Sequence, residues 1–125
     1  MIDAWHEGTP GAPLLDRLTD ELLTKLRAIG PERVTVIAQM VKLQDEVDEV
    51  VDAIQLNQLH DGPALAVLKE LADVVIVCNT AARVLGYSTN ALGLAVLRKS
   101  ARNAQRDWYP TASGTARHTP EEDQK

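Results

Sequence analysis

Aromatic residues are scarce in this 125-residue chain, which has two Trp, two Tyr and no Phe. Sandwiches and barrels draw on aromatic and β-branched residues, so the scarcity favours helices packed through Leu, Val, Ile and Ala. A single cysteine excludes an internal disulfide, and Cys78 is interpreted as a small core residue. The three His residues lie far apart, which leaves a Cys/His zinc site poorly supplied.

Long hydrophobic runs are also missing. The most apolar stretch, 71–82, contains Asp73 and Asn79 and is shorter than the roughly 18 residues that a membrane span needs. Residues 1–7 lack the basic and apolar regions of a secretory signal, so we expect a cytoplasmic protein without a membrane partner. The net charge of −5 argues against a surface for duplex DNA but permits a nucleotide that arrives with magnesium.

Hydrophobic periodicity predicts four helices, and hence an all-α four-helix bundle. Their expected ranges are 14–29, 31–59, 63–85 and 88–106. This helical domain, 14–106, follows an irregular lead-in at 1–13 and precedes a tail at 107–125 that is partly folded back or disordered. Because the third helix is apolar nearly all round, we expect a second subunit to complete the core in a homo-oligomer.

Two apolar seams predict that the second and third helices pack antiparallel across the break at 61–63. The spacing alternates between three and four residues in both helices, as in helix-on-helix packing. The expected seam positions are 36, 40, 43, 47, 50 and 54 in the second helix, and 68, 71, 75, 78, 82 and 85 in the third.

Five acidic residues fall within 45–52 of the second helix. Glu46 and Glu49 are three residues apart and therefore share one face, as do Glu70 and Asp73 in the third helix. At 1.5 Å per residue the two pairs lie at similar height along an antiparallel hairpin and can converge. All-oxygen ligands suit Mg²⁺, then Mn²⁺ or Ca²⁺, whereas a di-iron site requires His partners that are absent nearby.

A solvated acidic face is the alternative interpretation of this cluster. Two observations favour a bound cation over that alternative. The acids lack Lys partners four residues further on, so like charges at that spacing destabilise the isolated helix. Asp73 directly precedes an apolar run, where an acid without a ligand is costly.

The acidic segments resemble the MazG-like all-α nucleoside triphosphate pyrophosphohydrolase superfamily. Its signature is E-E-x-x-E, a variable spacer, and E-x-x-D; residues 42–49 read KLQDEVDE and residues 70–74 read ELADV. Asp45 stands where Glu is usual. Lys99, Asn103, Arg106 and Trp108 are similar to the end of the family's last helix.

The resemblance implies a homodimer or dimer of dimers that hydrolyses (deoxy)nucleoside triphosphates to monophosphate and pyrophosphate, in a nucleotide-pool housecleaning role. It implies Mg²⁺ as cofactor, with Mn²⁺ as a possible substitute. The implied metal ligands are Glu46, Glu49, Glu70 and Asp73, with a catalytic role for Glu46 and Glu49. The implied substrate-binding residues on the last helix are Lys99, Asn103 and Arg106.

Three further residues are candidates for substrate binding on their own chemistry. Gln39 and Lys42 lie two turns and one turn before Glu46, respectively, and Lys42 can reach a phosphate or simply neutralise nearby acids. Trp108 can stack on a base or pack against the bundle end. An alternative interpretation of the basic residues in the last helix is a solvated turn that complements the helix dipole.

Two rival functions stay open. The same site can serve phosphoribosyl-ATP, which a panel of nucleotide substrates distinguishes. Alternatively the chain is a non-catalytic helical oligomerisation module with an acidic face, which hydrolyses nothing and whose stability ignores Mg²⁺.

Overall fold

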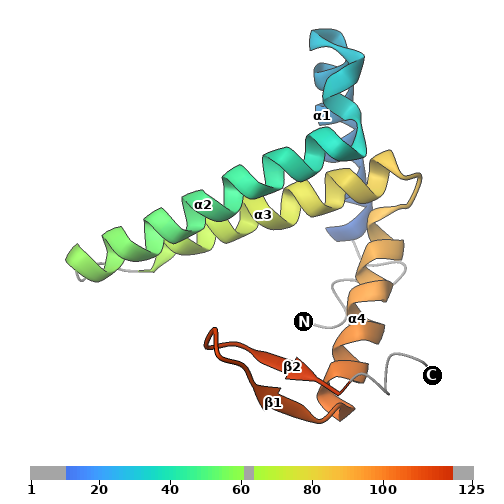
Figure 1. Ribbon diagram of the computed structural model, residues 1–125. Coiled ribbons are helices and arrows are strands. Elements are labelled where there is room, and N and C mark those ends of the chain that lie inside the picture. Colours follow the sequence, from blue (N-terminus) through green and yellow to red (C-terminus); the bar gives the residue numbers. More distant parts are fainter. Residues whose placement is uncertain (1–10, 61–63, 120–125) are drawn as a thin grey trace.

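The computed structural model describes residues 11–60 and 64–119, and over these ranges the chain is helical apart from one small sheet (Figure 1). The all-α expectation is confirmed at this level. Within the same ranges no helix is long and apolar enough to cross a membrane. The elements are α1 (Gly11–Ile29), the 3₁₀ helix η2 (Pro31–Val34), α2 (Val36–His60), α3 (Leu65–Val84), α4 (Thr89–Gln105), β1 (Trp108–Pro110) and β2 (Ala116–His118).

The helix ends follow local capping chemistry. The expected helix from residue 31 is interrupted at Thr35, whose backbone is extended and whose hydroxyl accepts a hydrogen bond from the Ala38 N–H at 3.1 Å. Thr35 is thus an N-cap that starts α2 anew, because its side chain satisfies a free N–H of the first turn. Of the expected lead-in, residues 11–13 are helical and the remainder lies outside the described residues.

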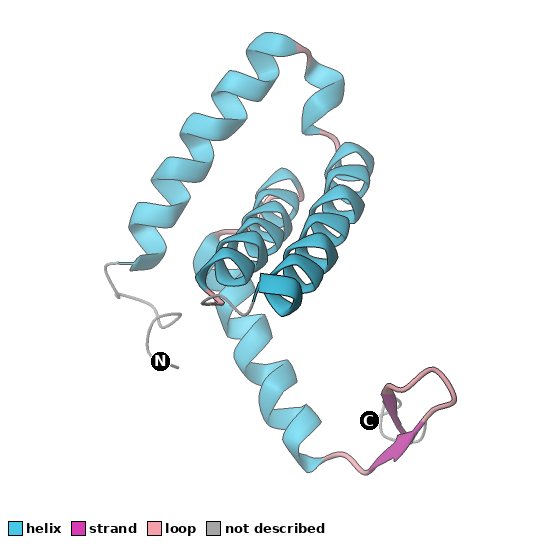
Figure 2. Ribbon diagram, turned by 90° about the vertical axis from the view of Figure 1, so that its left-hand side faces the viewer, coloured by secondary structure: helices cyan, strands magenta, loops and turns pink. Residues whose placement is uncertain are grey.

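α2 and α3 form a long antiparallel pair (Figures 1 and 2). Residues that face the neighbouring helix are buried or half-buried, and they recur at steps of three and four. They are 39, 43, 46, 50, 53 and 57 in α2, and 67, 70, 74, 77, 81 and 84 in α3. The expected spacing is present, and Leu43 and Val50 lie in the packed stripe as expected. Other expected seam positions are rotated out of it: Met40, Val47 and Ile54 are 38–45% exposed, and Leu68, Leu71 and Val75 are 46–61% exposed.

Polar side chains fix the junction of α1, α3 and α4. Asp16 of α1 accepts hydrogen bonds through one carboxylate oxygen from the Thr89 N–H at 2.8 Å and the Thr89 hydroxyl at 2.6 Å. Arg83 of α3 forms ion pairs with Asp16 and Asp20. Because Thr89 begins α4 and is fully buried, α1 holds the N-terminus of α4 in place.

The connection from α3 to α4 is a glycine turn followed by a serine cap. Gly86 has φ +97°, its N–H donates to the Arg83 carbonyl, and the Tyr87 N–H donates to the Ala82 carbonyl. This pair of bonds is the Schellman motif, which favours Gly because other residues are strained at positive φ. Ser88 then caps α4 by accepting a hydrogen bond from the Ala91 N–H at 3.0 Å.

Beyond Gln105 the chain turns into a β-hairpin, within the stretch that the sequence assigns to a tail. β1 and β2 pair antiparallel with Trp108 opposite His118, and these two rings meet edge-on with centroids 5.4 Å apart. α4 leads away from the α2–α3 pair, and the hairpin projects sideways from the far end of α4, on the side along which the pair extends (Figure 1). Residues 98–118, the second half of α4 with this hairpin, are called the C-terminal arm below.

Candidate metal centre

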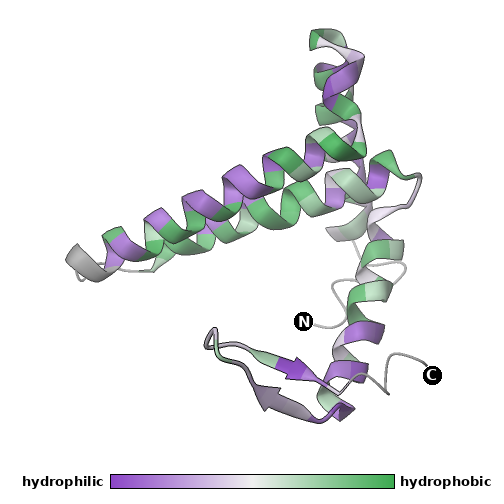
Figure 3. Ribbon diagram, in the orientation of Figure 1, coloured by the Kyte–Doolittle hydropathy of each residue, from purple (hydrophilic) through white to green (hydrophobic). Residues whose placement is uncertain are grey.

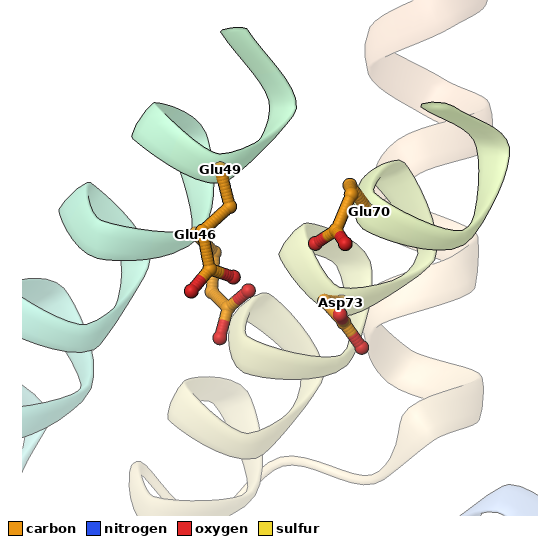
Figure 4. A group of neighbouring side chains, drawn as sticks. All are labelled: Glu46, Glu49, Glu70 and Asp73. Atoms are coloured by element: carbon orange, nitrogen blue, oxygen red, sulfur yellow. The ribbon is translucent and has the colours of Figure 1, made fainter. Parts of the chain in front are cut away.

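Four carboxylates converge midway along the α2–α3 pair (Figure 4). α2 supplies Glu46 and Glu49, and α3 supplies Glu70 and Asp73; one oxygen from each lies within 4.8 Å of the others. The three-residue spacing places each pair on one side of its helix, and the antiparallel packing brings the pairs to the same height. The convergence that the sequence predicts is therefore present in the structure.

The dimensions of the cluster suit a hard divalent cation. Oxygen ligands bind Mg²⁺ at about 2.0–2.1 Å and Ca²⁺ at about 2.3–2.6 Å, so oxygens on opposite sides of an ion lie about 4–5 Å apart. The distance of 4.8 Å within which the four carboxylate oxygens lie falls in this range. Glu49, Glu70 and Asp73 are accessible to solvent, which leaves room for water or a ligand on the open side.

Glu46 provides a second, independent sign of a ligand. The residue is only 5% exposed. Its Oε1 pairs with the Lys42 Nζ at 2.9 Å, but its buried Oε2 has no hydrogen-bond partner among the described residues. Leaving a buried carboxylate oxygen unsatisfied costs free energy that a cation would offset. The donor set and the free oxygen together fit a metal ion.

Electrostatic coupling makes the two carboxylates of α2 unequal. The hydrogen bond from Lys42, and then the close approach of the Glu49 carboxyl group, lowers the pKa of Glu46 below its ordinary value. The close approach of the Glu46 carboxylate and its charge, followed by partial desolvation and the more distant Glu70 charge, raises the pKa of Glu49. Glu46 in turn raises the pKa of Lys42. Glu49 is thus the carboxylate of this pair that binds a proton more readily.

An apolar pocket of about 540 Å³ opens beside the cluster. Glu46 and Asp73 form part of its wall, so the pocket and the cluster are continuous. The remaining wall comes mainly from α1, η2, α2 and α3, and includes Leu22, Leu26, Arg33, Ala38, Gln39, Lys42, Ile76, Val77 and Thr80.

Gln39 and Lys42, two of the predicted substrate-binding residues, therefore lie next to the acids. Gln39 is 6% exposed, and its side-chain amide donates to the Arg33 carbonyl at 3.0 Å, which ties α2 to η2. The sequence reasoning did not find Arg33, Leu22 or Leu26. No local motif marks them, because they reach the pocket only through the way that α1 folds back on α2 and α3.

The other predicted substrate-binding residues are not brought to the acids within this chain. Lys99, Asn103, Arg106 and Trp108 belong to the C-terminal arm, which lies apart from the α2–α3 pair in both views (Figures 1 and 2). Arg106 donates to the Asn103 side chain at 2.7 Å, and the Trp108 indole N–H donates to the Asn103 carbonyl at 2.8 Å. These contacts order the end of α4 as a unit of its own.

Comparisons with known proteins do not extend this description. No protein-family model matches the chain, and no curated protein or solved structure matches it either. The site is accordingly defined by its own geometry: four convergent carboxylates, one buried free oxygen and an adjoining apolar pocket.

Proposed function

We propose that the protein is a Mg²⁺-dependent nucleoside triphosphate pyrophosphohydrolase that releases nucleoside monophosphate and pyrophosphate, with Mn²⁺ as a substitute metal. The observation that carries the proposal is the four-carboxylate cluster with its unpartnered Glu46 oxygen beside an apolar pocket. An acidic patch repels a polyphosphate unless divalent ions lie between them, so this composition favours a ligand that arrives with its metal.

In this proposal Glu46, Glu49, Glu70 and Asp73 hold the metal. When bound, it neutralises phosphate charge and activates water. Lys42 keeps Glu46 ionised through their ion pair and presents a cation at the edge of the pocket. Glu49 is the solvent-accessible carboxylate of the α2 pair, which places it on the side from which the attacking water would enter.

The pocket supplies the part of the site that holds the nucleoside. Its volume lies within the range of about 300–1,000 Å³ that is common for small-ligand sites. Leucine and valine side chains line it and exclude water from the base. The resemblance to the MazG-like superfamily agrees with this assignment, and with it we propose a housecleaning role in the cytoplasm by an oligomer whose helices complete a bundle.

The test is a turnover assay over a panel of nucleoside triphosphates and phosphoribosyl-ATP, with pyrophosphate detection, with and without Mg²⁺. We expect Mg²⁺-dependent pyrophosphate release, and loss of at least about 100-fold in Glu70→Gln and Asp73→Asn, because fixed electrostatic groups at such sites contribute about that much. Asp48→Asn, an exposed charge on α2 outside the cluster, is the matched control. Full turnover in both cluster variants contradicts the assigned site, and turnover of phosphoribosyl-ATP alone reassigns the substrate.

A further inference from the structure

The apolar pocket has two chemically different ends. Glu46 and Asp73 line it where it meets the carboxylate cluster, which is called the metal end below. At the opposite end, called the base end, Glu32 and Arg33 of η2 form part of the wall. Along α2 the lining extends from residue 46 back to residue 38, which spans about 12 Å at 1.5 Å per residue. A nucleotide whose phosphates lie at the metal end therefore points its base toward η2.

The walls between the two ends are mainly apolar. α1 contributes Leu22 and Leu26, and α3 contributes Ile76 and Val77. Hydrophobic colours dominate the middle of α3, whereas hydrophilic and hydrophobic residues alternate along α2 (Figure 3). Such walls hold the faces of a planar base and exclude water from it, but they do not distinguish one base from another.

The polar groups in the middle of the pocket have partners within the chain. The Thr80 hydroxyl donates to a carbonyl of its own helix at 2.8 Å, and the side-chain amide of Gln39 donates to a carbonyl of η2 at 3.0 Å. The Lys42 ammonium pairs with an acid of the metal end at 2.9 Å. The edge of a base that extends toward η2 therefore meets Glu32 and Arg33, whose side chains are charged and exposed.

Gly30 leaves space for the Glu32 carboxylate beside the backbone that joins α1 to η2. An added Cβ at Gly30 would overlap this carboxylate, with its Oε2 at 2.8 Å. Every residue except glycine carries that Cβ, so glycine at position 30 allows this placement of Glu32. The next residue, Arg33, lines the pocket from the same short helix. An anionic and a cationic group thus occur together at the base end.

Guanine is the base whose edges match this pair of groups. Its N1–H and N2–H donate side by side, as a carboxylate accepts, and its neighbouring O6 and N7 accept, as a guanidinium donates. Adenine and cytosine each present one exocyclic amine next to ring acceptors, and thymine and uracil present one N–H between two carbonyl groups. None of these four offers both a pair of donors and a pair of acceptors.

We infer that Glu32 and Arg33 make the site selective for guanine nucleoside triphosphates. Glu32 accepts hydrogen bonds from N1–H and N2–H, and Arg33 donates to O6 and N7. The inference rests on the proposed function for the reaction and adds the base to it. Selectivity follows because any other base displaces water from these charged side chains without replacing all of its hydrogen bonds.

Two substrate analogues test the two contacts separately. Deoxyinosine triphosphate lacks the N2 amine that faces Glu32, and 7-deaza-deoxyguanosine triphosphate lacks the N7 acceptor that faces Arg33. We expect kcat/KM for pyrophosphate release to be at least about 10-fold higher for dGTP than for dATP, dCTP or dTTP. Each analogue should lose about 10-fold relative to dGTP, the usual size for a lost hydrogen bond to a charged group.

The variants should each remove one preference and keep the other. Glu32→Gln should abolish the preference for dGTP over the inosine analogue alone, and Arg33→Ala the preference over the 7-deaza analogue alone. Gly30→Ala displaces the Glu32 carboxylate and should match Glu32→Gln with an unchanged circular dichroism spectrum. Glu21→Gln and Arg27→Ala, exposed charges of α1 outside the pocket lining, are matched controls that should keep both preferences. Wild-type preferences in Glu32→Gln and Arg33→Ala overturn the inference.

Binding of nucleosides separates this inference from the proposed function. Guanosine and adenosine carry no phosphate and need no metal, so NMR titration with them probes the pocket alone. Guanosine binding that Glu32→Gln weakens, without turnover of any triphosphate, refutes the proposed function and supports guanine selectivity of the pocket. Pyrophosphate release at similar kcat/KM from dGTP, dATP, dCTP and dTTP supports the proposed function and overturns the selectivity. Neither turnover nor guanosine binding refutes both.

Discussion

The α2–α3 pair and the C-terminal arm differ in what holds them in place. The pair is stabilised by a continuous stripe that includes Val50 and Val77, and its acids converge between the two helices. The arm is joined to the rest of the structure through the first half of α4, whose N-terminus Asp16 and Ser88 cap, and its aromatic residues stay half exposed. The pair thus brings its four acids together through its own packing, whereas the cations of the arm lie apart from those acids in this chain.

The strongest test of the difference between the pair and the arm is to remove the buried acid of the pair. Glu46→Gln keeps the shape of the side chain but leaves Lys42 without its ionic partner and the cluster without its most buried charge. We expect turnover to fall by at least about 100-fold and the Mg²⁺-induced rise in melting temperature to disappear. Asp48→Asn controls for the lost charge on α2. Retention of the metal-induced rise in Glu46→Gln would show that the cluster does not bind the ion.

The pH dependence of metal binding tests the electrostatics of the acidic cluster in the pair. Because the pKa of Glu49 is raised, a proton competes with the metal at a higher pH than for an ordinary Glu. As pH falls from neutrality through this raised pKa, we expect the Mg²⁺-induced rise in melting temperature to shrink. Without metal the sign is opposite: the contribution of Glu49 to stability is present below its unfolded pKa and is lost as pH rises through the folded one.

The matched comparison for this pH effect is Glu46→Gln without metal. In this variant a neutral amide replaces the carboxylate that mainly raises the pKa of Glu49, so this pKa should fall. The pH at which the contribution of Glu49 to stability is lost should therefore move downward. Thermal unfolding between pH 4 and 8, or NMR titration of the carboxyl group, measures the shift. A profile that is unchanged in Glu46→Gln contradicts the coupling of the two carboxylates.

The anchoring of the arm is tested at Asp16. Asp16→Asn weakens the cap of α4 and the pairing with Arg83, and we expect a loss of about 1–2 kcal/mol in the free energy of unfolding, the usual size for a lost N-cap. Asp20→Asn removes only the exposed ion pair with Arg83 and should cost about 0–1 kcal/mol. Chemical denaturation measures both. Equal losses would show that the cap does not anchor the arm.

The smallest expected effect is at the turn that joins the pair to the arm. Gly86→Ala meets no atom within 4 Å of the new Cβ, so its cost comes from the positive φ alone, about 1 kcal/mol. Gly11→Ala also meets open space, but its φ is not positive and the substitution favours a helix. Thermal unfolding should place Gly86→Ala below the wild type and Gly11→Ala at or above it.

The helices and the acidic cluster were accessible from the sequence because both depend on local spacing. The three-residue steps of Glu46–Glu49 and Glu70–Asp73 set the face of each pair, and the break at 61–63 set the antiparallel order. The rotation of the seams was not accessible. The packed stripe of α2 includes the polar residues Gln39, Glu46 and Asn57. Hydrophobic periodicity therefore favours the neighbouring apolar positions, such as Met40 and Val47, although these stay exposed within the described chain.

The pocket and the hairpin lay beyond the sequence for different reasons. Leu22 and Leu26 follow an ordinary helical period, and only the return of α1 onto α2 and α3 makes them pocket residues. The hairpin strands have three residues each, too few for a period-two pattern to emerge. Its order comes from contacts such as the Trp108–His118 ring pair, which no spacing rule indicates.

The single junction at Gly86, Ser88 and Thr89 makes α4 a lever. At 1.5 Å per residue its 17 residues span about 25 Å, so a rotation of about 10° at Thr89 displaces the far end by about 4 Å. The Asp16 carboxylate is close to the pivot and sets this angle with two short hydrogen bonds. A substitution on α1 would thus change the distance between the cations at the far end of α4 and the carboxylates of the α2–α3 pair by more than it moves Thr89 itself.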